Sequence, residues 1–106
     1  MTAHLSLTPG RRPDGAPVLV VAGEVDLSNS ARFAEAIEQA LAPEAGPLTV
    51  DLTRVEYLDS AGLSVLFAHA EGIEVLSSAL LLPLLALSGL VDLAEVRHSG
   101  SSPDAD

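Results

Sequence analysis

Apolar residues along this chain fall into short runs separated by longer stretches with helical spacing. Continuous runs at residues 18–22 and 48–52 predict two strands, and Gly23 ends the first of them. Because residues 18–22 are apolar without a break, we expect that strand to be buried on both faces. An alternating run at 73–76 predicts a third strand, and residues 4–7 suit a short edge strand.

Helical spacing appears between these runs. Residues 28–30 offer helix caps, and Pro43 or Gly46 would end the helix that follows. A second helix is predicted over residues 60–71, with Gly72 as its C-terminal cap. The faces that these helices should bury carry apolar residues three or four positions apart: Phe33, Ile37, Ala40 and Leu41 in the first, and Leu63, Leu66, Phe67 and Ala70 in the second.

The remaining segments complete an α/β pattern. Residues 79–87 predict a third helix, and residues 93–97 a last strand. Residues 8–17, rich in glycine and proline, predict a loop. Strands that alternate with helices indicate one α/β domain over residues 1–98, a mixed sheet flanked by helices. The polar residues 99–106 are expected to form a disordered tail.

The segment from Tyr57 to Leu63 combines an acid, a small hydroxyl and a glycine at the junction of strand and helix. Ser60 is expected at or just inside the helix N-terminus, where unpaired N–H groups and the dipole favour an anion. Two interpretations follow. Asp59 or Ser60 is simply the helix cap, or Ser60 is a phosphorylatable serine on a protein-binding switch.

Charge and composition narrow the classes of partner. The 106 residues carry 15 acids against 5 basic residues, a net charge of −10, which opposes binding to nucleic acid or to an anionic membrane. A partner with a basic or mixed surface fits better. There is no cysteine, hence no disulfide or thiolate site. Residues 1–7 lack the features of a signal peptide, and a cytoplasmic location is expected. The uncharged stretch 75–91 is at the short limit for a membrane span, contains Pro83 and Gly89, and has acidic flanks without a nearby basic residue, so a buried strand and an apolar helix are expected instead.

Catalytic patterns are weak. A nucleophile elbow needs glycine two residues before the serine, where this chain has Leu58. His69 lies nine residues beyond Ser60, which on one helix is about 180° around and roughly 13 Å along, so it cannot act as the base. No metal-ligand spacing, phosphate loop or dinucleotide pattern is present, so we expect neither metal nor cofactor. Asp26, Asp51 and Asp59 would suit a receiver-like metal site, but the lysine of such sites is missing.

Three short motifs resemble those of the STAS domain, and more narrowly of the bacterial anti-sigma factor antagonists. They are Gly23–Asp26 after a strand, Asp59–Leu63 at the start of a helix, and Ser88–Leu90 before the final strand. The similarity covers roughly residues 4 to 97, with the motifs in family order.

The resemblance implies a non-catalytic switch without a cofactor. Domains of this kind bind an anti-sigma factor that is also a Ser/Thr kinase and so release the sigma factor. The kinase phosphorylates the motif serine, here Ser60, and a Ser/Thr phosphatase reverses the reaction. By position, the partner-binding surface would comprise the motif acids and the start of the helix: Asp26, Ser28, Asp59, Ser60, Ala61, Gly62, Leu63 and Ser64. In this interpretation Gly62 keeps the helix start open to a close partner.

Two departures from the family suggest an alternative function. The interval between Ser60 and the next strand is shorter than in the family by roughly eight residues, about two helical turns, so the second helix should be short. The helix at 79–87 is apolar on every side and either fills the resulting gap or binds another subunit. We expect Leu81 or Leu84, whichever faces outward, to form a protein contact. Pro83 should distort this helix unless it lies in the first turn. The alternative is a structural STAS subunit that forms homo-oligomers through residues 79–87 without phosphoryl control.

Overall fold

The computed structural model describes residues 4–98, and the predicted tail at 99–106 lies outside the described residues. One five-stranded sheet runs in the order β1-β2-β3-β4-β5. Its strands are β1 (Leu5–Arg11), β2 (Pro17–Val25), β3 (Leu48–Leu58), β4 (Ile73–Ser77) and β5 (Glu95–His98). The helices are α1 (Ser30–Ala40), α2 (Ser60–Ala68) and α3 (Leu82–Ser88), with the 3-10 turns η1 (Pro43–Ala45), η2 (Ala70–Gly72) and η3 (Leu90–Asp92).

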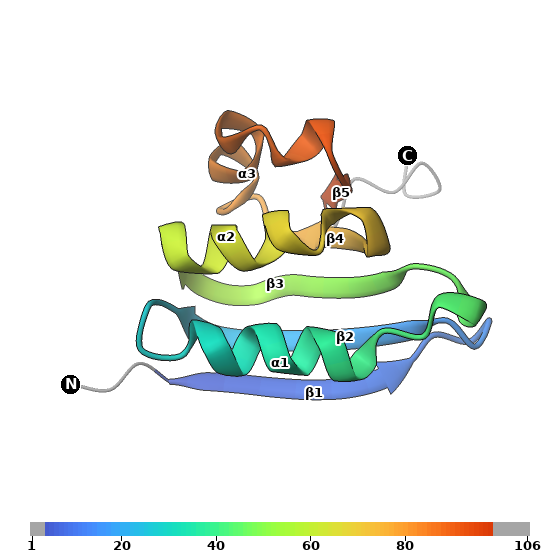
Figure 1. Ribbon diagram of the computed structural model, residues 1–106. Coiled ribbons are helices and arrows are strands. Elements are labelled where there is room, and N and C mark those ends of the chain that lie inside the picture. Colours follow the sequence, from blue (N-terminus) through green and yellow to red (C-terminus); the bar gives the residue numbers. More distant parts are fainter. Residues whose placement is uncertain (1–3, 99–106) are drawn as a thin grey trace.

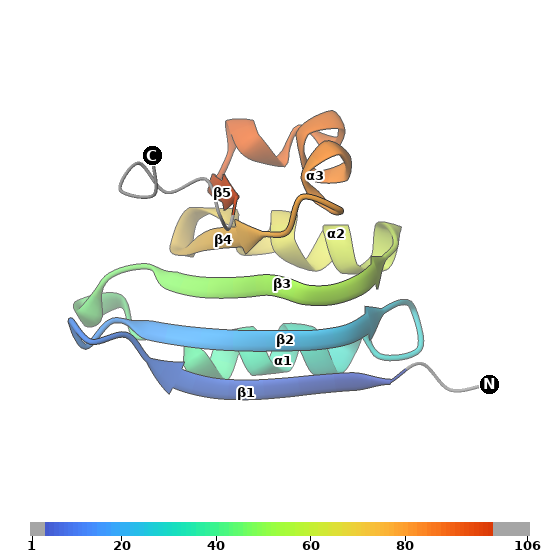
Figure 2. The same cartoon turned by 180° about the vertical axis from the view of Figure 1, so that it is seen from behind.

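The sheet is mixed because β1 is antiparallel to β2, while β2 to β5 pair in parallel. Each parallel connection moves one strand further in the same direction, and right-handed crossovers then place the connecting helices on one face. Figure 1 shows α1 and α2 in front of the sheet, and Figure 2 shows the strands uncovered from behind. The predicted fold class, an α/β domain with a mixed sheet and flanking helices, is confirmed.

The core lies between the helices and the covered face of the sheet. Phe33 and Ile37 of α1 and Leu66 of α2 are completely buried, as their spacing predicted. They pack with the inward residues of the central strands: Leu19, Val21, Val25, Leu48, Val50, Leu52, Ile73 and Val75. Ala40, Leu41, Leu63 and Phe67 are partly buried against this cluster, and Ala70 is buried in it.

One face of the sheet is open, and this corrects the expectation that residues 18–22 are buried on both sides. Leu19 and Val21 are buried, whereas Val18 and Val20 are only half-buried. A continuous apolar run does not distinguish a doubly covered strand from one whose outer residues are also apolar.

Two strands are longer than predicted. The proposed loop at 8–17 is wrong over its first half, since β1 continues to Arg11 with Pro9 paired to Leu19. Proline is tolerated there because β1 is an edge strand. β3 continues to Leu58 rather than ending at residue 52. Its polar second half suits the open face, and two register shifts against β2 obscure the alternation. β5 begins at residue 95 rather than 93.

The helices also differ from prediction at their ends. The short second helix is present: α2 has 9 residues and ends at Ala68, with His69 as its C-cap, so Gly72 is not its cap. α3 begins at Leu82 and places Pro83 in its first turn, where proline does not distort a helix. None of the helices within residues 4–98 is long and apolar enough to cross a membrane.

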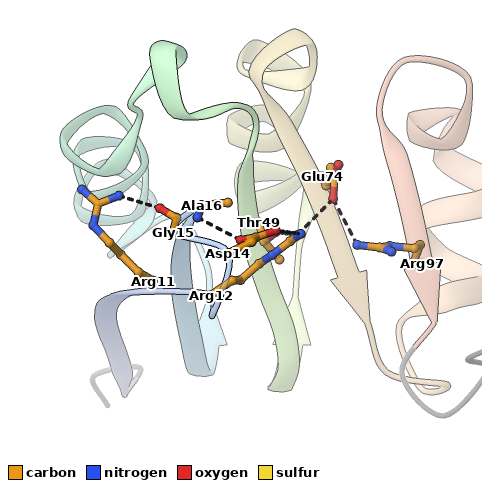
Figure 3. A network of polar contacts seen from close by, with 8 residues as sticks. All are labelled: Arg11, Arg12, Asp14, Gly15, Ala16, Thr49, Glu74 and Arg97. Carbon is orange, nitrogen blue, oxygen red and sulfur yellow. Dashed lines mark hydrogen bonds and ion pairs between the residues drawn. The ribbon is translucent and has the colours of Figure 1, made fainter.

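A polar network crosses the open face at the amino ends of the parallel strands (Figure 3). Arg12 donates to Thr49 Oγ1 at 3.2 Å and pairs with Asp14 at 2.8 Å. Glu74 lies between Arg12 at 3.8 Å and Arg97 at 3.1 Å, so it joins the β1–β2 turn to β4 and β5. The N–H of Ala16 and the Arg12 guanidinium lower the pKa of Asp14 below its usual 3.8. These arginines therefore serve the end of the sheet opposite to the motif serine.

Gly23 should be intolerant of substitution. Its φ is +103°, and a Cβ would lie 2.1 Å from the carbonyl oxygen of His4. The positive φ alone costs a non-glycine residue about 1–3 kcal/mol, so Gly23→Ala should lower the free energy of unfolding by at least that amount in urea denaturation. Gly10→Ala is the control, because a Cβ at Gly10 meets nothing within 4 Å. Equal stability of the two variants would contradict this account.

Candidate functional site

The candidate site is formed where β2 and β3 end side by side. Asp26 follows β2, and Asp59 follows β3. The backbone N–H of Asp59 donates to the carbonyl oxygen of Val25 at 3.2 Å, which joins the two strand ends directly. Carboxyl ends of neighbouring parallel strands are the usual position of ligand sites in α/β sheets. The motif acids, 33 positions apart in the sequence, are thus brought to one edge.

Asp59 caps α2. Its Oδ1 accepts hydrogen bonds from the N–H groups of Ala61, at 2.9 Å, and Gly62, at 3.3 Å. Ser60 is the first residue of α2 and is exposed. Of the two residues proposed as the cap, Asp59 is therefore the cap. The Ser60 hydroxyl takes no part in capping and lies at the surface.

The other predicted residues of α2 divide between surface and core. Ser64 is exposed one turn after Ser60, and its Oγ donates to the Ser60 carbonyl oxygen at 2.9 Å. Ala61 is half-buried. Leu63 is partly buried against the core, as its helical spacing predicted. Ser60 and Ser64 are thus the polar groups that α2 presents outward at this end.

Gly62 has a different role from the one expected. It is buried, and a Cβ there would lie 2.4 Å from Leu58 Cδ1 and 2.9 Å from Val25 Cγ1. The missing side chain lets α2 begin directly against the ends of β2 and β3. Gly62 therefore shapes the site from within the fold, where its missing side chain makes room for Val25 and Leu58.

The β2–α1 loop, residues 26–29, forms the other side of the site. Ser28 donates to Asp26 Oδ1 from its backbone N–H, at 2.8 Å, and from its hydroxyl, at 2.5 Å. Asn29 is 5% exposed and makes no side-chain cap bond to α1. Its Oδ1 accepts from the Asp26 N–H and its Nδ2 donates to the Glu24 carbonyl, both at 2.9 Å. Sequence reasoning treated Asn29 only as a possible cap, because asparagine commonly is one.

The site holds no catalytic arrangement around Ser60. His69 lies beyond the far end of α2, where Nδ1 donates to the Val65 carbonyl at 2.9 Å and Nε2 lies 3.4 Å from Glu38. His69 therefore connects the end of α2 to α1 and is not placed to act as a base for Ser60. Within the described part of the chain, no group of three or more His, Asp or Glu residues is placed to hold a metal ion. The site offers a carboxylate-flanked hydroxyl on a surface.

A second surface feature lies on α3. Leu81 and Leu85 are buried in the core, whereas Leu80, Leu84 and Leu87 are exposed. Of the two leucines proposed to face outward, Leu84 does so, at 37% exposure, and Leu81 does not. The predicted apolar outer face of this helix therefore exists.

The cap predicts a measurable loss of stability. Asp59→Ala removes the acceptor for two N–H groups and should lower the free energy of unfolding by about 1 kcal/mol. Asp59→Asn keeps an oxygen in the same place and should cost clearly less. Urea denaturation of both variants checks this. An alanine variant as stable as the asparagine variant would show that the cap bonds contribute nothing.

The sequence was compared with protein families and with known proteins, and both comparisons gave matches. Residues 10–95 match the STAS_2 family, described as "Mlab, STAS domain". The Listeria monocytogenes anti-sigma-B factor antagonist is 32% identical over 88 residues, 76% of this chain and 77% of the relative. The anti-sigma-F factor antagonist RsfB of Mycobacterium tuberculosis is 42% identical over 60 residues, 57% of this chain. That match spans about half of RsfB, 49% of its length.

Solved structures show the same fold. An anti-sigma factor antagonist from Mycobacterium paratuberculosis has a TM-score of 0.80 at 24% identity, over 95% of this chain and 89% of that one. Unphosphorylated SpoIIAA, an anti-sigma factor antagonist, has a TM-score of 0.59 at 11% identity, over 93% of this chain and 92% of that one.

Because the solved structures are less than 25% identical to this chain, they show a shared fold alone. The family match covers most of the sequence and therefore shows the family. The names of the relatives describe regulators, in agreement with the expectation of a domain without enzymatic activity. The predicted resemblance is confirmed, and this chain belongs to the STAS domain family.

Proposed function

We propose that this protein is an anti-sigma factor antagonist that binds an anti-sigma factor of the Ser/Thr kinase type and so releases a sigma factor. The observation that carries the proposal is the exposed Ser60 hydroxyl, the first residue of a helix whose cap is supplied by Asp59. The names of two groups of relatives support the general role. The proposed site of action is the cytoplasm, where sigma factors and ATP are found.

In the proposed reaction the partner is the enzyme and this domain is its substrate. The Ser60 oxygen forms a bond to the γ-phosphorus of ATP, the bond from that phosphorus to the β–γ bridging oxygen breaks, and ADP leaves. The hydroxyl proton passes to a base of the kinase. Hydrolysis of the phosphoserine by a Ser/Thr phosphatase returns the hydroxyl and releases inorganic phosphate.

A phosphate on Ser60 would change the fold little. The helix dipole favours a negative charge at this position by about 0.3–1 kcal/mol. Opposing this, the N–H groups of Ala61 and Gly62 are already bonded to Asp59, and the Asp59 and Asp26 carboxylates repel added charge. These contributions partly cancel within the domain.

The contact surface would respond much more strongly. A phosphate adds bulk and about −1.5 to −2 charge where a partner must approach Ser60 and Ser64 closely. A penalty of about 2.8 kcal/mol weakens binding roughly a hundredfold. The acidic balance of the chain, −10 in total, indicates that the partner surface is basic or mixed.

Substitutions of Ser60 test this proposal. Ser60→Ala should bind the anti-sigma factor like the wild type and resist inactivation by ATP, whereas Ser60→Asp should fold normally and bind about a hundredfold more weakly. Affinity is measured by calorimetry against each kinase-type anti-sigma factor encoded in the same genome, alongside thermal stability. Ser64→Ala is the control for the site of modification, because it removes the neighbouring exposed hydroxyl of α2 and should still be phosphorylated at Ser60. Equal affinity of the wild type, Ser60→Ala and Ser60→Asp would remove Ser60 from the switch.

The exposed leucines of α3 favour a second candidate, a structural STAS subunit that assembles through this helix without phosphoryl control. Leu87 is 89% exposed, and Leu84 is exposed as well. Both lie in residues 75–91, a segment without a charged residue between Glu74 and Asp92. Several exposed leucines on one short segment are typical of a surface that contacts another protein.

Under this second candidate, Leu87→Gln should convert an oligomer to a monomer. It should not lower the melting temperature of the monomer, because the Leu87 side chain is exposed and does not pack in the core. Leu85→Gln is the contrast, since Leu85 is fully buried and its replacement should destabilise the fold. Light scattering and thermal denaturation measure the two effects. A wild-type protein that is monomeric at high concentration rules out self-assembly.

A further inference from the structure

Leu27 is an exposed apolar side chain at the end of the sheet where β2 ends and α2 begins. It lies in the β2–α1 loop between Asp26 and Ser28 and is 81% exposed. Isolated surface leucines are common and need no explanation by themselves. What distinguishes Leu27 is the order of the loop that carries it.

Hydrogen bonds on both sides of Leu27 fix the loop. The Asp26 carboxylate accepts the N–H and hydroxyl of Ser28, and the N–H of Asn29 donates to the Asp26 carbonyl at 3.2 Å. On the buried side of the loop, the Asn29 amide accepts a hydrogen bond from the Asp26 N–H and donates one to the Glu24 carbonyl. An exposed residue whose neighbours are bonded inward loses little conformational freedom when a partner binds.

The loop and the start of α2 are two sides of one surface. The bond from the Asp59 N–H to the Val25 carbonyl joins them at their bases. Both views show the β2–α1 loop and the beginning of α2 at the same end of the sheet (Figures 1 and 2). A partner that covers this end of the sheet can contact Ser60 and Leu27 together.

We propose that Leu27 is the apolar anchor of the surface that binds the kinase-type anti-sigma factor, and that Asn29 is the positioning residue that holds it there. This inference rests on the proposed function and assigns roles to two residues outside the predicted surface. Asp26 precedes the anchor in the loop, and Asp59 follows the neighbouring strand, so the complementary socket on the partner is apolar with a basic rim. Anchors of this kind contribute most of the affinity of an interface.

The test measures affinity for the purified kinase-type anti-sigma factors encoded in the same genome, with Ser60 unphosphorylated. Leu27→Ala should weaken binding about tenfold or more. Because the Leu27 side chain is exposed, the substitution should not unfold the domain, and weaker binding would then reflect the lost contact. The matched control is Leu93→Ala, a leucine that is 59% exposed beyond η3 and should leave affinity unchanged.

Asn29→Ala should also weaken binding, and its effect should depend on Leu27. If Asn29 acts by positioning Leu27, the double variant binds about as weakly as Leu27→Ala alone, since coupled residues are not additive. Hydrogen exchange at the Asp26 amide should accelerate in Asn29→Ala. Thr49→Val, which removes a buried polar contact at the opposite end of the sheet, should change neither quantity.

Each outcome decides something. Wild-type binding with an unaltered Leu27→Ala affinity overturns the anchor and leaves the proposed function intact. Fully additive effects of Leu27→Ala and Asn29→Ala overturn the positioning role. If the wild type binds none of the anti-sigma factors, the proposed function and this inference fail together. Should Asn29→Ala not fold, Leu27→Ala and its control still decide the anchor.

Discussion

The site depends on the junction where β2 and β3 end and α2 begins. One backbone bond, from the Asp59 N–H to the Val25 carbonyl, fixes the two strand ends to each other. Gly62 lets the first turn of α2 rest directly on Val25 and Leu58, because any Cβ would collide with them. The position of Ser60 at the surface follows from this contact, since the turn that carries it is packed from below.

The junction also separates structural duties from exposed chemistry. Asp59 uses one carboxylate oxygen to satisfy two helix N–H groups, a task that a serine could also have filled. Asn29 holds the neighbouring loop from a buried position. The stabilising polar groups are thus drawn inward, while Ser60 and Leu27 remain outward. An arrangement of this kind suits a surface that must change its charge without losing its fold.

The two ends of the sheet are built for different purposes. At the amino ends of the parallel strands, Arg12, Glu74 and Arg97 form a network that joins the β1–β2 turn to β4 and β5 across the open face. At the carboxyl ends, Asp26 and Asp59 form no ion pair with an arginine among the described residues, and both carboxylates accept hydrogen bonds from nearby N–H groups. Ion pairs therefore join strands at one end of the sheet, whereas the acids at the other end are left for the recognition that we propose.

Local pattern determined much of this protein. The spacing of Phe33, Ile37 and Leu66 marked the buried helix faces, because helical periodicity survives any tertiary context that covers one side. The ordered motifs around Asp26 and Ser60 identified the family. Tertiary structure alone decided the rest: the full length of β1 and β3, the open face of the sheet, and the roles of Gly62 and Asn29. These depend on what lies opposite each residue, such as Val25 and Leu58 beneath Gly62, and no local pattern records which distant segments meet.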